Sequence, residues 1–354
     1  MKFMCFIHTT KKITAAFLIL SLALIAASCS QPASSESLKK YEFTLAHFFP
    51  GTHPAEKEFV QGWIKEIEKA TSGRVVITSY PNEVLRKGAD IYDGVVEGVI
   101  DIGLSCFSYT AGRFPVLEAF ELPGIIYKNA KVASMVAWEG IKLLDPDEIK
   151  DTKLMMVITT GSGDLFTKSP VEKLEDLRGM EIRVTGACAK TIEALGGISV
   201  GMTQAEAYEA LQKGIVKGNL APIEVLQGWN HADVTKYITK TPFLYNTLFF
   251  VTMNLDKWNS LPGDIQNAIL EVNERFLEEV GAGLWDKQNE AALKWALEEK
   301  GMTVIELSEG ETERWIKKVE PIQEEYMAKI RSLDIKEDVL KVVKELAEKY
   351  NEIY

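Results

Sequence analysis

The sequence predicts an α/β protein of two lobes, with a hinged cleft between the lobes and a long helix that crosses both of them. Three observations support this prediction. Strand-like and helix-like segments alternate from residue 41 to about residue 254, two similar helix–strand units occur one in each half, and long charged helices follow Asn254. The length of 354 residues suits two domains of roughly 150 residues each.

The N-terminus differs in character from the rest of the chain. Lys2, Lys11 and Lys12 precede an apolar run over residues 13–27. The run is shorter than the roughly 20 apolar residues that a membrane-spanning helix needs. A basic flank, an apolar middle and small residues after it are typical of a secretory signal peptide, which we expect over residues 1–28.

The apolar run ends in Ala26-Ala27-Ser28-Cys29. Small residues before a cysteine resemble the lipobox of bacterial lipoproteins, with Ala26 at the position that usually holds leucine. The resemblance implies lipidation of Cys29, with residues 29–40 as a flexible tether to the membrane. The alternative is an unlipidated signal peptide that is cut nearby.

The first ordered elements follow in a clear alternation. Residues 41–49 read as a strand, and Pro54 begins a helix whose apolar positions recur every three or four residues until Gly73 ends it. A strand over 74–80, a helix through Ile91 and Val95, and a strand over 101–105 come next. We expect mainly parallel pairing of these strands.

The alternation continues into the second half. Later segments read as helices at 130–144, 187–195 and 205–213 and as strands at 153–159, 180–184, 198–202 and 242–254. Residues 256–300 and 311–350 read as helices whose apolar positions include Trp258, Trp285, Trp295 and Trp315, which we interpret as core. The predicted first lobe comprises 41–160 plus about 249–288, and the second 161–248 plus about 289–354. Two or three chain crossings, near 158–161 and 246–250, would join them.

Residues 92–103 and 208–219 align without a gap. Each has a tyrosine, then an acidic residue, apolar helix positions and a glycine, Gly98 or Gly214, before a strand. One such unit in each half favours two lobes of related construction. The alternative is that any glycine-ended helix before a strand looks like this.

Several function classes find no support. The net charge is −11 and no basic stripe occurs, which argues against nucleic-acid binding. Gly161-Ser162-Gly163 lacks the spacing and the lysine of a phosphate loop. We find no nucleophile–base pair, so an enzyme is not expected, and no cofactor is implied.

Cysteines and histidines give no metal motif. Cys106 and Cys188 are expected to be buried free thiols, with a disulfide in an oxidising compartment as the alternative. His47 and His53 are interpreted as serving a loop.

In open α/β sheets, ligands bind beyond the carboxyl ends of the strands. Three such loops carry little charge, and they contain Phe48 and Phe49, Phe107 to Tyr109, and Leu220 to Pro222. The fourth follows Arg183, whose side chain points away from those of its neighbours in an apolar strand. A buried arginine needs a counter-charge, which would be either a ligand carboxylate held by two N–H···O bonds or an acid such as Glu181.

Several segments resemble one known family. They are VEKLEDLRGMEIRVTG (171–186), the run from Lys190 to Gly218, DGVVEGVIDIGLS (93–105) and RFPVLEAFELPG (113–124). They are similar to the substrate-binding proteins of tripartite ATP-independent periplasmic (TRAP) transporters, of the dicarboxylate-binding type, from Tyr41 to about Ser332. The resemblance implies a periplasmic-binding-protein-like fold, a periplasmic location, a small organic acid as ligand, and small and large membrane subunits as partners. It also implies that Arg183 clasps the ligand carboxylate.

The sequence departs from that family at two positions. Ala221 stands where many members have an asparagine, and residues 161–167 lack the second arginine of several sugar-acid binders. Glu83 matches a loop that faces the cleft in the family, or is simply solvated. We therefore expect a monocarboxylate with an apolar or aromatic body, near residues that include Phe48, Phe49, Phe107, Tyr109, Leu220 and Trp229.

Alternative functions remain at this stage. One is a C4-dicarboxylate-binding component, in which Lys190 or Lys168 would meet the second carboxylate. Another is a ligand sensor for a membrane receptor, since it would use the same cleft.

Overall fold

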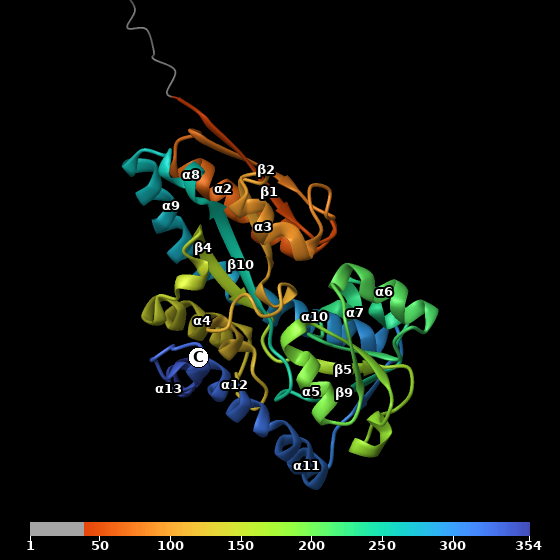
Figure 1. The fold of residues 1–354 in the computed structure, drawn as a ribbon. Coiled ribbons are helices and arrows are strands. Elements are labelled where there is room, and N and C mark those ends of the chain that lie inside the picture. The colour runs from red at the N-terminus through yellow and green to blue at the C-terminus, as the bar shows by residue number, and fades with distance from the viewer. Residues whose placement is uncertain (1–38) are drawn as a thin grey trace, which may run out of the picture. The chain divides into compact units, whose positions relative to one another are not determined.

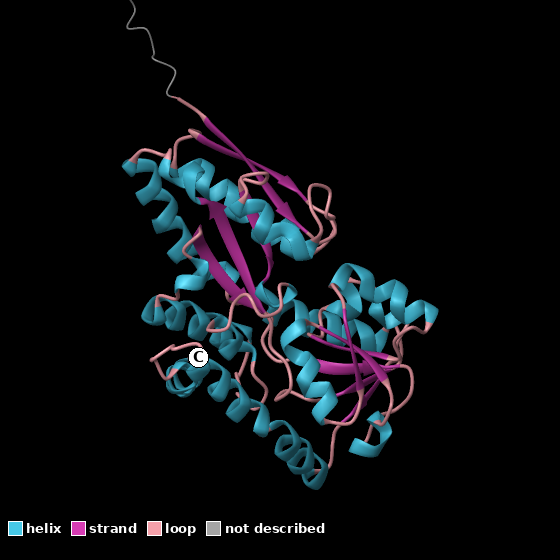
Figure 2. Ribbon diagram, viewed as in Figure 1, coloured by secondary structure: helices cyan, strands magenta, loops and turns pink. Residues whose placement is uncertain are grey.

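Two β-sheets covered by helices form the frame of the protein (Figures 1 and 2). The structure is a computed structural model that describes residues 39–354. The predicted signal peptide and Cys29 lie outside the described residues. The sheets and their helices define two lobes, as expected.

The first sheet has the strand order β2-β1-β3-β10-β4. Its strands are β1 (Tyr41–His47), β2 (Val75–Tyr80), β3 (Ile102–Cys106), β4 (Thr152–Thr159) and β10 (Leu248–Asn254). Its helical segments include η1 (Ala55–Val60), α2 (Gln61–Ala70), α3 (Ile91–Val96), α4 (Ala130–Leu144) and α8 (Leu255–Asn259). The segment after β3 is irregular, with short turns η3 (Phe107–Tyr109) and η4 (Leu117–Glu121).

The second sheet has the order β11-β9-β5-β8-β6-β7. Its strands are β5 (Asp164–Thr167), β6 (Glu181–Val184), β7 (Ile198–Gly201), β8 (Gly218–Ala221), β9 (Tyr237–Thr239) and β11 (Thr303–Ile305). Helical segments between them include η6 (Leu174–Leu177), η7 (Gly186–Cys188), α5 (Ala189–Ala194), α6 (Gln204–Lys213), α7 (Val225–Gly228) and η8 (His231–Asp233).

The expectation of mainly parallel sheets is wrong in part, because both sheets are mixed. β1 is parallel to β2 and β3, and β6 is parallel to β7 and β8. β10 is antiparallel to β3 and β4, and β5 is antiparallel to β8 and β9. β5 and β10 are each the first strand after a short crossing from the other sheet, and each runs opposite to both of its neighbours.

Two short segments, in addition to the long helical run after β10, carry the chain between the sheets. Residues 160–163 join β4 to β5, and residues 240–247 join β9 to β10. The strand predicted at 242–254 is therefore shorter, since its first six residues form a crossing. Gly161 has φ +68°, and a Cβ atom there would lie 2.8 Å from the backbone nitrogen of Ala130. Only glycine fits this bend without strain.

The predicted long helix is present as a nearly continuous run, formed by α9 (Gly263–Phe276), η9 (Leu277–Gly281) and α10 (Leu284–Glu298). α9 packs on α2 and β4 of the first lobe, whereas α10 packs on α7 of the second lobe as well as on α4 (Figure 1). The run therefore spans both lobes, with a short interruption after Gly281.

The sequence predicted that the end of the chain belongs to the second lobe, but the last helices return to the first lobe. α11 (Glu309–Val319) packs on α5 and η6, but α13 (Val339–Ile353) packs on α4 of the first lobe. Between them, α12 (Pro321–Ser332) contacts the first lobe, where Lys329 pairs with Glu118 at 2.5 Å. The apolar stripe of a helix predicts that one face is covered, but it does not predict by which layer.

The paired helix–strand units are confirmed. α3 leads into β3 and α6 leads into β8, and Gly98 and Gly214 after the two helices both have φ +72°. This left-handed conformation favours glycine at the end of a helix. The two lobes thus share one local construction.

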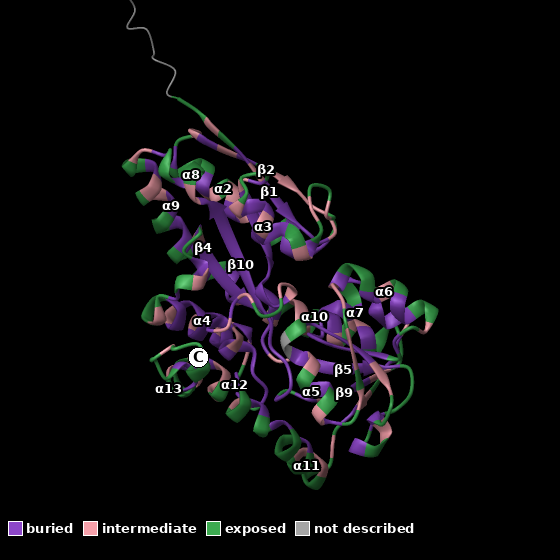
Figure 3. Ribbon diagram, in the orientation of Figure 1, coloured by how far each residue is buried: buried purple, intermediate pink, exposed green. Residues whose placement is uncertain are grey.

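Most residues of both sheets are buried, and the helices carry both buried and exposed positions (Figure 3). Trp258, Trp285 and Trp315 are buried as expected, and Trp295 is half-buried. Cys106 and Cys188 are buried free thiols. Within residues 39–354, no helix combines the length and the apolar character that a membrane crossing requires.

Candidate ligand-binding site

Arg183 lies in β6 and is only 1% exposed. Its Nε donates to the carbonyl of Met202 at 3.0 Å, and its Nη1 donates to the side-chain oxygens of Gln204 at 2.9 Å and Asn219 at 3.3 Å. No Asp or Glu of the described chain forms an ion pair with it, so the structural salt bridge to Glu181 is wrong. Nη2 is buried and has no hydrogen-bond partner in the described part of the chain. A buried donor without an acceptor is unfavourable, and it marks where an acceptor would bind.

Behind Arg183, two amide side chains connect it to His231. The nitrogens of Gln204 and Asn219 each lie 3.1 Å from a ring nitrogen of His231. Burial and the nearby guanidinium lower the pKa of His231 to about 3. The imidazole is therefore neutral at physiological pH, and Arg183 carries the only positive charge of this group of four side chains.

Arg183 faces a cavity whose walls come from both lobes. Six aromatic side chains line it, namely Phe48, Phe49, Tyr109, Trp229, Tyr245 and Phe249. Its polar lining includes Thr160, Thr185, Gln204, Glu224 and Thr247. The cavity measures about 20 Å³, which is room for about one water molecule. An organic acid would fit only after the walls move apart.

The aromatic walls meet across the cleft. The Phe48 ring of the first lobe stacks on Trp229 of the second at a centroid distance of 6.0 Å, and it lies 4.4 Å from Phe49. Trp229 is mostly buried, and its Nε1 has no hydrogen-bond acceptor among residues 39–354. These side chains offer apolar surface and one unpaired indole donor, an arrangement suited to a ring with a polar substituent.

Two polar contacts join the lobes beside this cavity. The backbone N–H of Gln204 donates to the Tyr109 hydroxyl at 2.9 Å. His53 Nε2 lies 2.9 Å from Glu224 Oε2, and both side chains are buried. His47 pairs locally with Glu56 at 2.8 Å, as a loop residue would. His53 serves its loop as expected, because its Nδ1 accepts from the backbone N–H of Ala55 at 3.0 Å, and it has a second partner in Glu224, which is 171 positions away.

The lobes also approach closely through backbone atoms. A Cβ atom at Gly186, in the loop after β6, would lie 2.6 Å from the carbonyl oxygen of Ser108 in the first lobe. Such a separation is far below van der Waals contact, so this approach requires glycine.

The structure brings together some of the predicted residues and separates others. Phe48, Phe49, Tyr109, Arg183 and Trp229 line one cavity. The other candidates, Phe107, Leu220, Ala221 and Glu83, do not line it.

Each of those others has a different role. Phe107 packs in the core at 5.0 Å from Phe250, and Leu220 is fully buried. Ala221 pairs with Asp164 between β8 and β5. Glu83 accepts a hydrogen bond from the Gly88 nitrogen at 2.6 Å, which stabilises its own loop.

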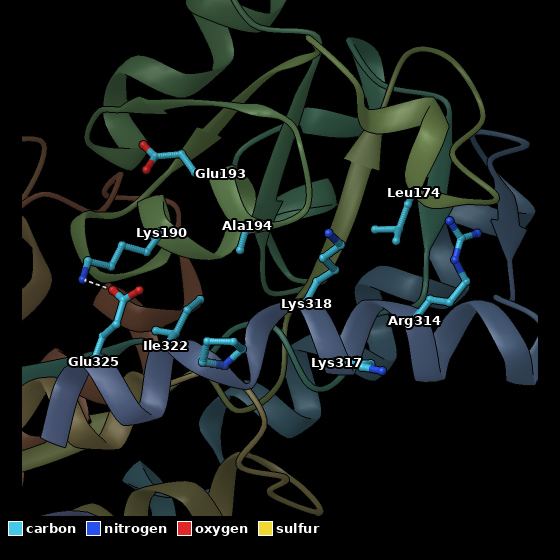
Figure 4. Close-up of a pocket in the computed structure, with 10 residues that line it drawn as sticks. Leu174, Lys190, Glu193, Ala194, Arg314, Lys317, Lys318, Ile322 and Glu325 are labelled. Carbon is cyan, nitrogen blue, oxygen red and sulfur yellow. Dashed lines mark hydrogen bonds and ion pairs between the residues drawn. The ribbon is translucent and has the colours of Figure 1, made fainter. Parts of the chain in front are cut away.

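The lysines considered for a second ligand carboxylate lie elsewhere. Lys190 pairs with Glu325 at 2.8 Å in a separate groove of about 740 Å³ between α5, α11 and α12 (Figure 4). Lys168 donates to the carbonyl oxygen of Leu211. Neither lines the cavity at Arg183, so the cations expected for a dicarboxylate are absent from the described lining.

Sequence reasoning missed Gln204, Glu224, Tyr245, Thr247 and Phe249 as lining residues. Glu224 lies two positions after Pro222, in a loop that the sequence analysis had selected because it follows the carboxyl end of a strand. Tyr245 and Thr247 were not considered because the sequence predicts a buried strand there. In the structure, residues 240–247 form a crossing between the lobes.

Other titratable groups near the cavity are poor reactants. Burial raises the pKa of the Cys188 thiol to about 12 and that of Cys106 well above its usual range. Thiolates are the reactive form of cysteine, so neither side chain is suited to nucleophilic attack. No group of three His, Cys, Asp or Glu side chains in the described chain is arranged to hold a metal ion.

Comparison with known proteins gives consistent similarities. The family described as bacterial extracellular solute-binding protein, family 7, matches residues 45–330. The C4-dicarboxylate-binding periplasmic protein of Rhodobacter capsulatus is 26% identical over 74% of this chain and 80% of its own length.

Solved structures agree in fold. A TRAP solute-binding protein from Rhodoferax ferrireducens, in complex with copurified benzoate, is 25% identical with a TM-score of 0.83, covering 89% of this chain and 99% of that chain. A marine metagenome TRAP solute-binding protein specific for aromatic acid ligands, in complex with metahydroxyphenylacetate, is 28% identical with a TM-score of 0.83, covering 88% and 99%.

Proposed function

Because the chain belongs to family 7 of the bacterial extracellular solute-binding proteins, the family of TRAP transporter receptors, we propose that it captures a monocarboxylate with an apolar or aromatic body between its lobes. The observation that carries this proposal is Arg183 Nη2, a buried donor without an acceptor at an aromatic-lined cavity. A carboxylate there would receive charge-assisted hydrogen bonds.

The neighbouring side chains support a single carboxylate. Arg183 is the one cationic side chain in the described lining of the cavity. A second carboxylate would enter without a cation, and each buried polar group left unpaired costs about 1–3 kcal/mol. The aromatic side chains favour a ring or a branched apolar group instead. The solved relatives bound to benzoate and to metahydroxyphenylacetate bind ligands of this class.

Closure is the proposed mechanism of capture. A ligand that touches both lobes stabilises the closed form over the open form. The two crossings at residues 160–163 and 240–247 would act as the hinge. The closed complex would then dock on the membrane subunits of a TRAP transporter, with Cys29 as the proposed lipid anchor in the periplasm.

Calorimetric titration tests the proposed ligand class. Benzoate and phenylpyruvate should bind the purified protein, whereas malate and succinate should bind weakly or not at all. Tight binding of malate with no response to the aromatic acids would replace this proposal with the C4-dicarboxylate function.

A further inference from the structure

Glu224 shares the cavity with Arg183. We propose that Glu224 selects among carboxylate ligands: it receives a hydrogen-bond donor on the ligand body, either a hydroxyl or an ammonium group, and it repels a second carboxylate. This inference rests on the proposed function, because it assumes that Arg183 holds the first carboxylate.

Glu224 is held in place from several sides. It is only 4% exposed, and its backbone N–H donates to the Asn289 side chain of α10 at 2.9 Å. Its Oε2 lies 2.9 Å from His53 Nε2. A Cβ atom at Gly228 would lie 2.6 Å from His53 Nε2 and 2.7 Å from Glu224 Oε2, so glycine leaves the space that this pair occupies.

His53 does not neutralise the charge of Glu224. The backbone N–H of Ala55 donates to His53 Nδ1 at 3.0 Å, so Nδ1 acts as an acceptor. The single ring hydrogen is therefore assigned to Nε2, which donates to Glu224. A neutral imidazole beside a carboxylate leaves the pair with one net negative charge.

The second oxygen of Glu224 remains available. Oε1 has no hydrogen-bond donor among the described residues, and Glu224 lines both the Arg183 cavity and a pocket of about 410 Å³ beyond it. Glu224 thus forms part of the wall between the two spaces. Each carboxylate oxygen can accept more than one hydrogen bond.

Counting charges gives the direction of selectivity. Among the described lining residues of the cavity, Arg183 is positive and Glu224 is negative. A ligand carboxylate balances Arg183, and the charge of Glu224 then remains. A second carboxylate would meet like charge in a poorly solvated space, whereas a hydroxyl or an ammonium group would meet an acceptor.

The first test needs only the unmodified protein. Calorimetric titration should compare phenylacetate with mandelate, with 3- and 4-hydroxyphenylacetate, with phenylalanine and with phenylsuccinate. We expect at least one donor-bearing ligand to bind about tenfold or more tightly than phenylacetate, and phenylsuccinate to bind more weakly. Preference for a hydroxylated acid identifies a hydroxyl as the donor, and preference for phenylalanine identifies an ammonium group. Equal or weaker binding of every donor-bearing ligand would overturn the proposal.

The second test uses Glu224→Gln, which keeps an acceptor for His53 but removes the charge. Phenylsuccinate should gain affinity relative to phenylacetate, and the preference for the donor-bearing ligand should shrink. Glu58→Gln is the matched control, because Glu58 lines the outer pocket beside Lys287 at 3.6 Å and does not line the Arg183 cavity. An unchanged order of ligands in Glu224→Gln would contradict the role of Glu224.

The two proposals fail separately. If Arg183→Ala binds phenylacetate as the unmodified protein does, the carboxylate clasp is wrong. If Arg183→Ala loses binding and Glu224→Gln keeps the original order of ligands, only the role of Glu224 is wrong.

Discussion

Gln204 links Arg183 to the opposite lobe. Its side-chain oxygen accepts a hydrogen bond from Arg183 Nη1 at 2.9 Å, and its backbone N–H donates to the Tyr109 hydroxyl at 2.9 Å. One residue therefore holds the proposed carboxylate clasp and a contact that exists only while the lobes are together. Positioning of the clasp and closure of the cleft are coupled through this residue.

Replacing Arg183 should remove ligand binding. Loss of the partner of a desolvated carboxylate costs about 2–5 kcal/mol, so Arg183→Ala should weaken binding of an aromatic monocarboxylate by roughly two to three orders of magnitude. Arg183→Lys should restore little, because an ammonium group cannot make the planar two-bond contact. Calorimetry gives the affinities, and circular dichroism checks the fold. Arg314→Ala, in the separate groove of Figure 4, should bind as the unmodified protein does.

Removing the Tyr109 hydroxyl should weaken the closed form. In Tyr109→Phe the Gln204 N–H loses its acceptor when the lobes close, a loss of about 1 kcal/mol, so affinity should fall by roughly fivefold. Tyr237→Phe is the control, since no hydrogen bond involves that hydroxyl in the described chain. Equal affinities for the Tyr109→Phe and Tyr237→Phe variants would show that this contact does not contribute to closure.

A methyl group at Gly186 should oppose closure. Its Cβ would lie 2.6 Å from the Ser108 carbonyl oxygen, whereas nothing lies within 4 Å of a Cβ at Gly201. Gly186→Ala should therefore remain folded but show a larger radius of gyration by small-angle scattering in the presence of ligand, with weaker binding. Gly201→Ala should match the unmodified protein in both measurements. Full compaction of Gly186→Ala by ligand would contradict the closed geometry.

Glu121 should make stability depend on pH. Its carboxylate oxygen accepts from the Leu248 nitrogen at 2.6 Å, and burial raises its pKa to about 8. A folded-state pKa above the unfolded value means that the folded form binds more protons, so this group favours folding most at low pH. Its contribution to the free energy of unfolding should decline by at most about 1.4 kcal/mol per pH unit as the pH rises from about 4.5 to 8. Above about pH 8 this contribution should be constant.

Glu121→Gln isolates this effect, because glutamine keeps the acceptor and cannot ionise. The melting temperature of Glu121→Gln minus that of the unmodified protein should increase steadily between pH 5 and pH 8. Glu313→Gln, at an exposed site on α11, should follow the unmodified protein throughout. A constant difference between Glu121→Gln and the unmodified protein across this range would show that Glu121 does not titrate there.

Local patterns in the sequence predicted most of the helices and strands and part of the site. Arg183 was a candidate because a charged residue in an apolar strand needs a partner, and the family resemblance favoured a ligand carboxylate over an acid such as Glu181. Phe48 and Tyr109 were candidates because they follow strand ends. Glu224 and His53 were not identifiable together, since 171 positions separate them and neither belongs to a motif. The packing of α13 on α4 was missed for a similar reason. An apolar stripe shows that one face of a helix is buried, but it does not show which element covers that face.

A crystal structure of the complex with phenylpyruvate tests the central claim most directly. The account predicts that a ligand carboxylate oxygen lies within about 3 Å of Arg183 Nη2, with the ring among Phe48, Trp229 and the neighbouring aromatic side chains. A ligand carboxylate paired elsewhere in the cleft, or a ligand bound in the groove between α5 and α12, would contradict the account.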